Sequence, residues 1–255
     1  MQFPTTGRRV LITGASRGLG RAMAQAFAAN GDRVAVHYGS READALRTLE
    51  SLAGTGHVLV GGDLSDPARA ADVAGRAAEG LGGIDVLVNN AAVNERHPLP
   101  ETPYEEWVAV WQQHVAVNLL ATAHLSHLAG RRMIDGGTGG RIVNIGSRGA
   151  FRGEPEHPAY GATKAAVHAL GQSLAVSLAP YGIGVASVAP GFFETERVAD
   201  RLSGAEGEAI RAQSPFGRVA SADEIAAAVL WLASSLAEWS SGTVLDLNGA
   251  SYLRT

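Results

Sequence analysis

Cysteine is absent from this sequence of 255 residues, and lysine occurs once. Without cysteine the chain can form no disulfide, thiolate nucleophile or cysteine-ligated zinc site. The sequence also lacks the roughly 18 consecutive apolar residues of a membrane helix, and its first ten residues contain no apolar segment of a secretory signal. The net charge of −4 and the lack of any run of like charge argue against a nucleic-acid surface. We therefore expect a cytoplasmic protein that binds neither nucleic acid nor a membrane.

The one lysine, Lys164, stands against 20 arginines. Codon bias accounts for the arginines, but it leaves open why this position carries an ammonium group. An ammonium group is a compact point charge whose pKa shifts readily on burial, which a guanidinium group cannot match. Lys164 is therefore a candidate site residue, although one lysine can also persist by chance.

Short runs rich in Val, Ile and Leu alternate with longer helical patterns along the chain. The expected strands are 8–13, 33–37, 57–61, 84–88, 141–145, 184–188 and 243–246, and the expected helices are 20–30, 41–52, 67–79, 104–133, 158–178 and 222–233. Continuous apolar runs are typical of strands covered on both faces, as in parallel sheets. The sequence therefore predicts an α/β fold, a single Rossmann-type domain over residues 1–255 with a doubly wound parallel sheet of about seven strands.

Three glycines follow the first expected strand, in Thr13-Gly14-Ala15-Ser16-Arg17-Gly18-Leu19-Gly20. Glycine permits a tight turn and lets backbone N–H groups approach a pyrophosphate, and the following helix start favours the same anion. The spacing departs from the general G-x-G-x-x-G fingerprint. We favour a dinucleotide-binding loop over a plain strand–helix turn.

The end of the second expected strand bears on which nicotinamide cofactor binds. NAD sites commonly place an acidic residue there for the ribose hydroxyls, but this segment reads His37-Tyr38-Gly39-Ser40-Arg41. Arg17, Ser40 and Arg41 suit a 2′-phosphate instead, because arginine binds phosphate through two parallel hydrogen bonds. We expect NADP(H) to be preferred, with NAD(H) possible if both arginines are merely solvated.

Tyr160 and Lys164 lie four residues apart in an expected helix, so they share one face. A nearby ammonium group favours the phenolate and lowers a tyrosine pKa from its reference of about 10, which suits acid–base chemistry near neutral pH. Ser147 follows an expected strand at the carboxyl edge of the sheet, where its hydroxyl can hold a carbonyl oxygen.

With these motifs in this order the chain resembles the short-chain dehydrogenase/reductase family, and among its members it looks most like the 3-oxoacyl-acyl-carrier-protein reductases. Further matching pieces are Asp63-Leu64, Asn89-Asn90-Ala91-Ala92, Asn118 and Pro190-Gly191 with Thr195; Ala92 and the segment Asn248-Gly249-Ala250 depart from the usual glycines. The resemblance implies that Asp63 and Leu64 bind adenine, that Asn90 and Ala91 line the ribose, and that Pro190, Gly191, Phe193 and Thr195 hold the nicotinamide. It also implies that Asn118 joins Ser147, Tyr160 and Lys164 as a catalytic residue, that Tyr160 and Lys164 contact the cofactor, and that the protein is a homotetramer or homodimer.

The sequence thus predicts an NADP(H)-dependent oxidoreductase that moves a hydride between nicotinamide and a carbonyl compound or secondary alcohol, with Tyr160 as acid and base. The alternatives are an NAD-linked alcohol dehydrogenase, a 3-oxoacyl thioester reductase and, more remotely, a non-catalytic dinucleotide sensor. Arg131 and Arg132 match a carrier-protein docking position of the thioester reductases, but Val176 stands where they have a second arginine. No convergent carboxylate accompanies the helical histidines His114, His124 and His127, so we expect no metal site.

The substrate is expected to lie between the charged segment 148–157, the region after Asn94 and a lid at about 192–213. The composition of 203–207, Ser-Gly-Ala-Glu-Gly, predicts a flexible segment in that lid. Arg148 and Arg152 favour a substrate with a polar or anionic group near the reacting carbon, unless their charges turn outward. A ridge of small residues from Gly161 to Ser173 faces either the sheet or a second subunit.

Overall fold

A computed structural model describes residues 7–194 and 204–254 of the chain. In this part seven strands form one sheet in the order β3-β2-β1-β4-β5-β6-β7, and every neighbouring pair is parallel. The strands are β1 (Arg9–Ile12), β2 (Arg33–Tyr38), β3 (Val58–Gly61), β4 (Val86–Asn89), β5 (Gly140–Ile145), β6 (Ile183–Pro190) and β7 (Val244–Leu247). The predicted doubly wound Rossmann-type sheet is confirmed.

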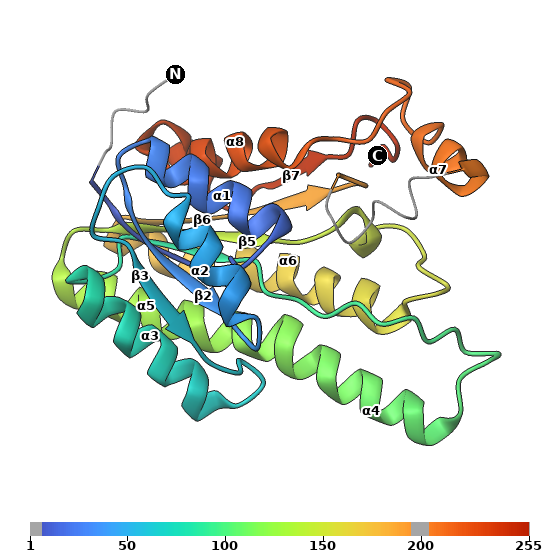
Figure 1. Cartoon of the computed structure of the whole chain (residues 1–255), viewed down its shortest axis with the longest axis horizontal. Coiled ribbons are helices and arrows are strands. Elements are labelled where there is room, and N and C mark those ends of the chain that lie inside the picture. The colour runs from blue at the N-terminus through green and yellow to red at the C-terminus, as the bar shows by residue number, and fades with distance from the viewer. Residues whose placement is uncertain (1–6, 195–203, 255) are drawn as a thin grey trace.

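Helices cover both faces of the sheet (Figure 1). One layer contains α1 (Gly18–Ala29), α2 (Glu42–Glu50) and α8 (Ala222–Leu232), and the other contains α3 (Pro67–Leu81), α5 (Ala121–Gly136) and α6 (Pro158–Leu178). Each layer buries its own hydrophobic core against the sheet. The middle of β1 shows why its run is continuous: Val10, Leu11 and Ile12 are all fully buried, because successive side chains face opposite layers.

Local signals set the helix ends. The Asp66 carboxylate caps α3 by accepting hydrogen bonds from two backbone N–H groups, Pro67 stands at the first position, and Gly82 ends the helix at φ +79°. Ser221 and Glu224 form a reciprocal capping box at the start of α8. These caps lie within a residue or two of the ends predicted from the sequence.

Two segments differ from the sequence prediction. The single helix expected over 104–133 is α4 (Tyr104–His114) and α5 joined by a π-helical segment, η1 (Val115–Leu120). Residues Gly204–Arg211, expected within a flexible lid, form the helix α7, because Gly207 and Ile210 are buried on one side of it. The rest of the segment expected as a lid includes 195–203, which lie outside the described residues.

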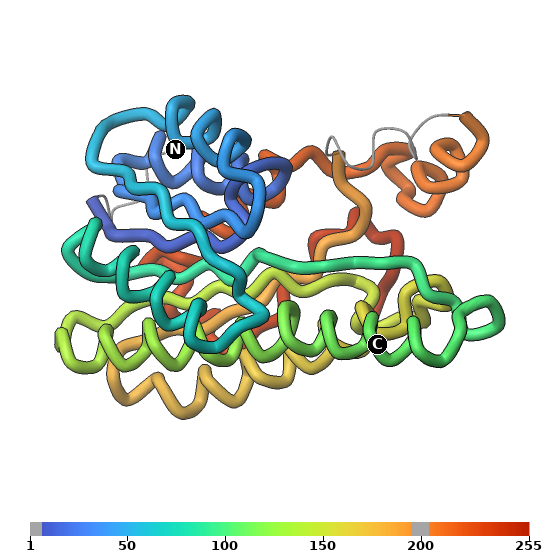
Figure 2. Tube along the Cα trace, turned by 60° about the horizontal axis from the view of Figure 1, so that its bottom comes forward, coloured from blue at the N-terminus to red at the C-terminus, as the bar shows by residue number. Residues whose placement is uncertain are grey.

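The order of the strands reverses between β1 and β4, and α1 and α5, which come after these two strands, pack in opposite layers. Such a switch point leaves a crevice at the carboxyl ends of the strands, where open α/β sheets bind ligands. In Figures 1 and 2 the starts of α4 and α6 and the helix α7 lie toward this same end of the sheet. In the described residues no helix combines the length and apolarity that crossing a bilayer requires.

Candidate active site

A pocket of about 890 Å³ occupies the crevice at the carboxyl ends of the strands. It brings together all but two of the residues predicted for cofactor and catalysis. Those lining it are Gly14, Ser16, Arg17, Gly18, Leu19, Gly20, Ser40, Arg41, Asp63, Leu64, Asn90, Ala91, Ser147, Tyr160, Lys164, Pro190, Gly191 and Phe193. Asn118 lies behind the wall, and Thr195 lies outside the described residues.

The glycine loop between β1 and α1 needs its glycines for two physical reasons. Gly14 and Gly18 adopt φ of +64° and +52°, a left-handed conformation that other residues adopt at a cost. A Cβ atom at Gly20 would lie 2.2 Å from the Gly14 carbonyl oxygen, so α1 packs closer to the loop than any side chain permits. The result is a cradle of backbone at a helix start, the arrangement that suits a phosphate group.

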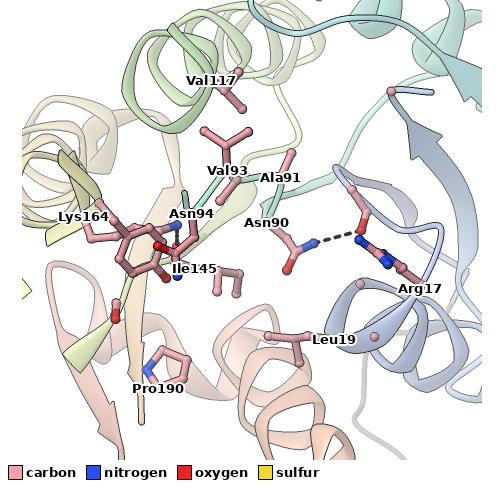
Figure 3. Close-up of a pocket in the computed structure, with 18 of the residues that line it drawn as sticks. Arg17, Leu19, Asn90, Ala91, Val93, Asn94, Val117, Ile145, Lys164 and Pro190 are labelled. Atoms are coloured by element: carbon pink, nitrogen blue, oxygen red, sulfur yellow. Dashed lines mark hydrogen bonds between the residues drawn. The ribbon is translucent and has the colours of Figure 1, made fainter. Parts of the chain in front are cut away.

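The loop after β4 is fastened to the glycine loop by polar contacts. The Thr13 hydroxyl accepts hydrogen bonds from the backbone N–H groups of Asn90 and Ala91, at 2.8 and 2.9 Å. The Asn90 side-chain amide donates to the carbonyl oxygens of Thr13 and Gly14, the latter at 3.1 Å (Figure 3). The two sides of the switch-point crevice are therefore held at a fixed separation.

Three side chains that could hold a 2′-phosphate lie on the same pocket. Arg17 is the N-cap residue of α1, and Ser40 and Arg41 precede α2. Among the described residues Arg17 has no carboxylate partner, whereas Arg41 lies 3.8 Å from Asp44 and is more than half exposed. Arg17 is therefore the cation that is freer to bind an anion.

The catalytic candidates meet at the ends of β5 and α6. Ser147 caps the short helical turn Arg148–Ala150, because its hydroxyl oxygen accepts a hydrogen bond from the Gly149 N–H at 3.0 Å, and this contact fixes the side chain. The Lys164 Nζ donates to the Ile145 carbonyl oxygen at 2.7 Å (Figure 3) and lies 5.6 Å from the centre of the Tyr160 ring. Burial lowers the pKa of Lys164 to about 8.

Asn118 supports the pocket from behind. It lies in the π-helical segment η1 and is buried. Its amide accepts from the Val93 N–H at 2.9 Å, donates to the Val93 carbonyl at 3.0 Å, and donates to the Thr163 hydroxyl at 3.2 Å. Asn118 thus fixes the backbone beside the pocket, and its catalytic role stays a prediction.

The charged segment 148–157 only partly follows the sequence prediction. Arg148 is 5% exposed and lines the pocket, as do Glu154, Glu156 and His157. Arg152 is absent from the lining, so the expectation that both arginines face the substrate is wrong for Arg152. Glycine at 149 lets the turn fold back against Glu154, whose carboxylate oxygen lies 2.8 Å from where a Cβ would stand. The described residues contain no cluster of three or more metal-ligating side chains.

Sequence reasoning missed His37, which couples two loops of the pocket. Its Nδ1 accepts from the Gly14 N–H and its Nε2 donates to the Gly62 carbonyl, each at 3.0 Å, so the ring is held neutral. Burial, together with the charge of Arg76, lowers the pKa of His37 to about 4 despite the contact with Gly62. The sequence signal for this role was a histidine inside an otherwise apolar strand, because a buried imidazole needs hydrogen-bond partners for both of its ring nitrogens.

The structure predicts an acid-sensitive fold. His37 and His168 both have pKa values lowered to about 4, in each case chiefly by burial, whereas an unfolded histidine has a pKa near 6.5. Between these values protons bind the unfolded chain preferentially, so stability is full above pH 6.5 and is lost as the pH falls toward 4. Each histidine should cost about 2 kcal/mol of unfolding free energy at pH 5.

Urea unfolding of the His37→Gln variant at pH 7 and pH 5 checks this. Glutamine can retain both contacts without titrating, so the loss between the two pH values should shrink by about 2 kcal/mol. His127→Gln, at an exposed position, is the control and should leave the loss unchanged. If His37→Gln lost as much unfolding free energy between pH 7 and pH 5 as the unaltered protein, His37 would be excluded as a cause of the acid sensitivity.

Comparison with known proteins places this geometry among dehydrogenases and reductases. A family model described as "Enoyl-(Acyl carrier protein) reductase" matches residues 14–249. The chain is 35% identical over 250 residues, 97% of each chain, to L-rhamnose 1-dehydrogenase (NAD(P)(+)) of Sphingomonas sp. strain SKA58. It is 36% identical to the 3-oxoacyl-[acyl-carrier-protein] reductase of Escherichia coli K12, covering 97% of this chain and 98% of that one. The structure of an angucycline C-6 ketoreductase with bound NADP matches with a TM-score of 0.85 and 31% identity, covering 98% of this chain and 97% of that one.

Proposed function

The chain belongs to the short-chain dehydrogenase/reductase family, an oxidoreductase family, and on that premise we propose that it is an NADP(H)-dependent enzyme acting on a carbonyl compound or secondary alcohol. The observation that carries the proposal is the single pocket in which the glycine cradle and the side chains of Ser147, Tyr160 and Lys164 meet. In this proposal residues 1–255 form a single domain that both binds the cofactor and carries out the reaction.

The pocket fits a dinucleotide. The backbone cradle at Gly14–Gly20 suits the pyrophosphate, because two of the first three residues of α1, Gly18 and Gly20, have no side chain to cover the backbone N–H groups at the helix start. Asp63 and Leu64 would lie beside the adenine, Asn90 and Ala91 beside a ribose, and Pro190, Gly191 and Phe193 beside the nicotinamide. When bound, the nicotinamide supplies or accepts the hydride.

The chain's own residues then manage the substrate oxygen and its proton. In the direction of reduction, the Tyr160 hydroxyl gives its proton to the oxygen as the carbonyl becomes an alkoxide. The Ser147 hydroxyl donates a hydrogen bond to the same oxygen, since its own oxygen is already oriented by the Gly149 N–H. The Lys164 ammonium, fixed by the Ile145 carbonyl, stabilises the phenolate that remains on Tyr160.

Arg17 should determine the preference for NADPH. In the Arg17→Ala variant we expect the Kd for NADPH to rise about 30-fold, because one charge-assisted contact to phosphate is worth about 2 kcal/mol. The Kd for NADH should change less than about 3-fold, since NADH has no 2′-phosphate to lose. Fluorescence titration with both cofactors measures the two constants.

Arg33→Ala is the matched control, because Arg33 is exposed at the opposite end of β2. It should leave both constants as they are. Equal affinities for the two cofactors in the unaltered protein, with no change in Arg17→Ala, would support the NAD-linked alcohol dehydrogenase instead.

A substrate screen tests the proposed reaction. Aldehydes, ketones, secondary alcohols, sugars and an acyl thioester are offered with each nicotinamide, and absorbance of the reduced cofactor is followed. At least one carbonyl or alcohol should be turned over. Tight NADPH binding with no turnover of any compound would contradict the proposal and favour the dinucleotide sensor.

Reduction of 3-oxoacyl thioesters is the second candidate, favoured by the resemblance to the Escherichia coli reductase. The site offers it less support. At the matching docking position Arg131 forms an ion pair with Asp135 at 2.9 Å and Arg132 donates to the Leu128 carbonyl oxygen at 3.2 Å. Val176 at the second position is 80% exposed and uncharged. The side chains that the segment 148–157 contributes to the lining, Arg148, Glu154, Glu156 and His157, are polar or charged and gain nothing from an alkyl chain.

We further propose that the protein assembles as a homotetramer or homodimer in the cytoplasm. Ala165, Ala169 and Ser173 of the small-residue ridge are exposed on α6, so this part of the ridge faces away from the sheet and is free to meet a second subunit. Trp239 is fully exposed beyond α8. Light scattering of the purified chain measures the assembly, and a monomer at micromolar concentration would contradict it.

A further inference from the structure

Arg148 is a buried cation at the mouth of the catalytic end. It follows Ser147 directly, is 5% exposed, and lies between the main pocket and a neighbouring cavity of about 240 Å³ that also contacts α7. One of its five N–H donors is accounted for, by a hydrogen bond from Nη1 to the Ser251 hydroxyl at 2.5 Å. Its guanidinium carbon lies 5.3 Å from the centre of the Phe192 ring. No carboxylate among the described residues is within ion-pair distance of it.

The C-terminal segment 248–254 holds this arginine in place. Asn248 donates from its side chain to the Tyr252 carbonyl at 3.0 Å, and the Tyr252 hydroxyl donates to the Phe151 carbonyl at 2.9 Å. The Arg254 guanidinium carbon lies 4.2 Å from the centre of the Phe151 ring. The segment is turned back by Gly249 and Ala250, both at φ +59°, which is a strained conformation for alanine. A segment this well fastened gives Ser251 a fixed position against Arg148.

The other polar side chains of the substrate end include three carboxylates, which accept hydrogen bonds. The lining there includes Asn94, Glu95, Gln113, Glu154, Glu156 and His157. Glu156 is paired with Arg96 at 2.5 Å, but neither Glu95 nor Glu154 has an ion-pair partner among the described residues. The charge of Glu154 acts on Arg148, and Glu95 lies exposed on the same lining, so the wall as a whole carries no excess of positive charge.

We propose that Arg148 is the substrate-orienting donor of this site, positioned by Ser251, and that the substrate is a neutral polyhydroxylated compound, a sugar or polyol. This inference rests on the proposed function. A hydroxyl group both accepts and donates hydrogen bonds, so adjacent hydroxyls can accept from Arg148 and donate to carboxylates such as Glu154. A carboxylate or an alkyl chain satisfies at most one of these two kinds of partner.

The same wall disfavours two other substrate classes. A carboxylate would meet Arg148 but also the charges of Glu95 and Glu154, which repel it. An alkyl chain would leave the buried N–H donors of Arg148 without partners, and a site built to hydrogen-bond hydroxyls rejects analogues that lack them. The anionic substrate allowed by the sequence is thus replaced by a neutral one.

The first experiment compares substrates of one carbon skeleton. Aldoses and alditols are screened with NADPH and NADP, and the best is compared with its uronic acid, its amino sugar, its deoxy analogues and the plain aldehyde of equal length. The neutral polyol should have the highest kcat/KM, and removal of the hydroxyl nearest the reacting carbon should lower kcat/KM about 100-fold. A higher kcat/KM for the acid, the amine or the plain aldehyde would overturn the inference while leaving the oxidoreductase assignment intact. If no compound were turned over, both the inference of a polyol substrate and the oxidoreductase assignment would be contradicted.

The second experiment changes the arginine. Arg148→Gln should lower kcat/KM for the polyol about 10–100-fold, mostly through KM, and that for the deoxy analogue less than about 3-fold. Arg148→Lys should keep part of the activity, because it retains the charge but not the planar fork. Arg152→Gln, in the same loop but outside the lining, is the control and should match the unaltered enzyme. An equal loss on all substrates in Arg148→Gln would mean a structural role only.

Ser251 is tested as a positioning residue by a double-mutant cycle. Ser251→Ala should raise KM for the polyol, and Ser251→Thr, which retains the hydroxyl, should restore it. In an Arg148→Gln background Ser251→Ala should have no further effect, because the two residues act through one contact. Additive effects of the two changes would show that Ser251 does not act through Arg148.

Discussion

Tyr160→Phe should lower kcat about 10²–10⁴-fold, because the variant removes only the oxygen that we propose exchanges a proton with the substrate. The ring remains, so its contact with the Lys164 ammonium at 5.6 Å and the shape of the pocket are preserved. The Kd for NADPH should therefore stay within about 3-fold of its original value, since no contact of the phosphates or adenine changes. Steady-state kinetics in both directions and a cofactor titration measure the two effects.

Tyr181→Phe is the matched control for this change. Tyr181 is 53% exposed and lies before β6, at the opposite end of the sheet from the pocket. The Tyr181→Phe variant should therefore have the same kcat as the unaltered enzyme. If Tyr160→Phe kept full turnover, another group would have to supply the proton, and the assignment of Tyr160 as acid and base would be wrong.

Gly20→Ala should abolish tight cofactor binding and weaken the fold. The added methyl group would stand 2.2 Å from the Gly14 carbonyl oxygen, 2.8 Å from the Ala15 Cα and 2.9 Å from the Asn90 amide nitrogen. The first two atoms belong to backbone, so α1 or the glycine loop must move. We expect the Kd for NADPH to rise at least about 100-fold and the free energy of unfolding to fall by about 2–4 kcal/mol.

Gly75→Ala separates this effect from the general one of replacing glycine in a helix. Gly75 lies within α3, and nothing approaches within 4 Å of where its Cβ would stand. Alanine there should stabilise the fold by about 0.5–1 kcal/mol and leave cofactor affinity unchanged. Urea unfolding and titration with NADPH compare the two variants. Unchanged NADPH binding in Gly20→Ala would contradict the proposal that the backbone at Gly14–Gly20 binds the cofactor phosphates.

The segment 148–157 shows that a sequence can predict which charged residues lie near a pocket but not which of their side chains face it. A run containing arginines, glutamates and a histidine predicts that some charge faces the substrate, but its local pattern is the same for either direction of each side chain. Arg148 turns inward because Ser251, 103 residues later, and Phe192 provide its contacts. Arg152, four residues further on, finds no such partners in the pocket.

The small-residue ridge of α6 also separates what the local sequence predicts from what tertiary packing decides. Spacing of four residues predicts that its members share one face, which is a property of the helix itself. Whether that face meets the sheet depends on which side of α6 the other helices and β6 occupy. The structure exposes Ala165 and Ala169 and buries Val167 and His168, so the other face of α6 packs inward.

By itself the sequence determined the parallel sheet, the glycine cradle and the pairing of Tyr160 with Lys164, because each follows from a local rule. Apolar runs specify buried strands, positive φ favours glycine, and a separation of four residues fixes a shared helix face. Only the tertiary structure decided that His37 joins Gly14 to Gly62, that Asn118 holds Val93, and that the C-terminal segment fixes Arg148. These contacts join residues 23 to 103 positions apart, and nothing in the local pattern distinguishes them from other arrangements, because buried polar groups take whichever partners the packing of distant elements brings within reach.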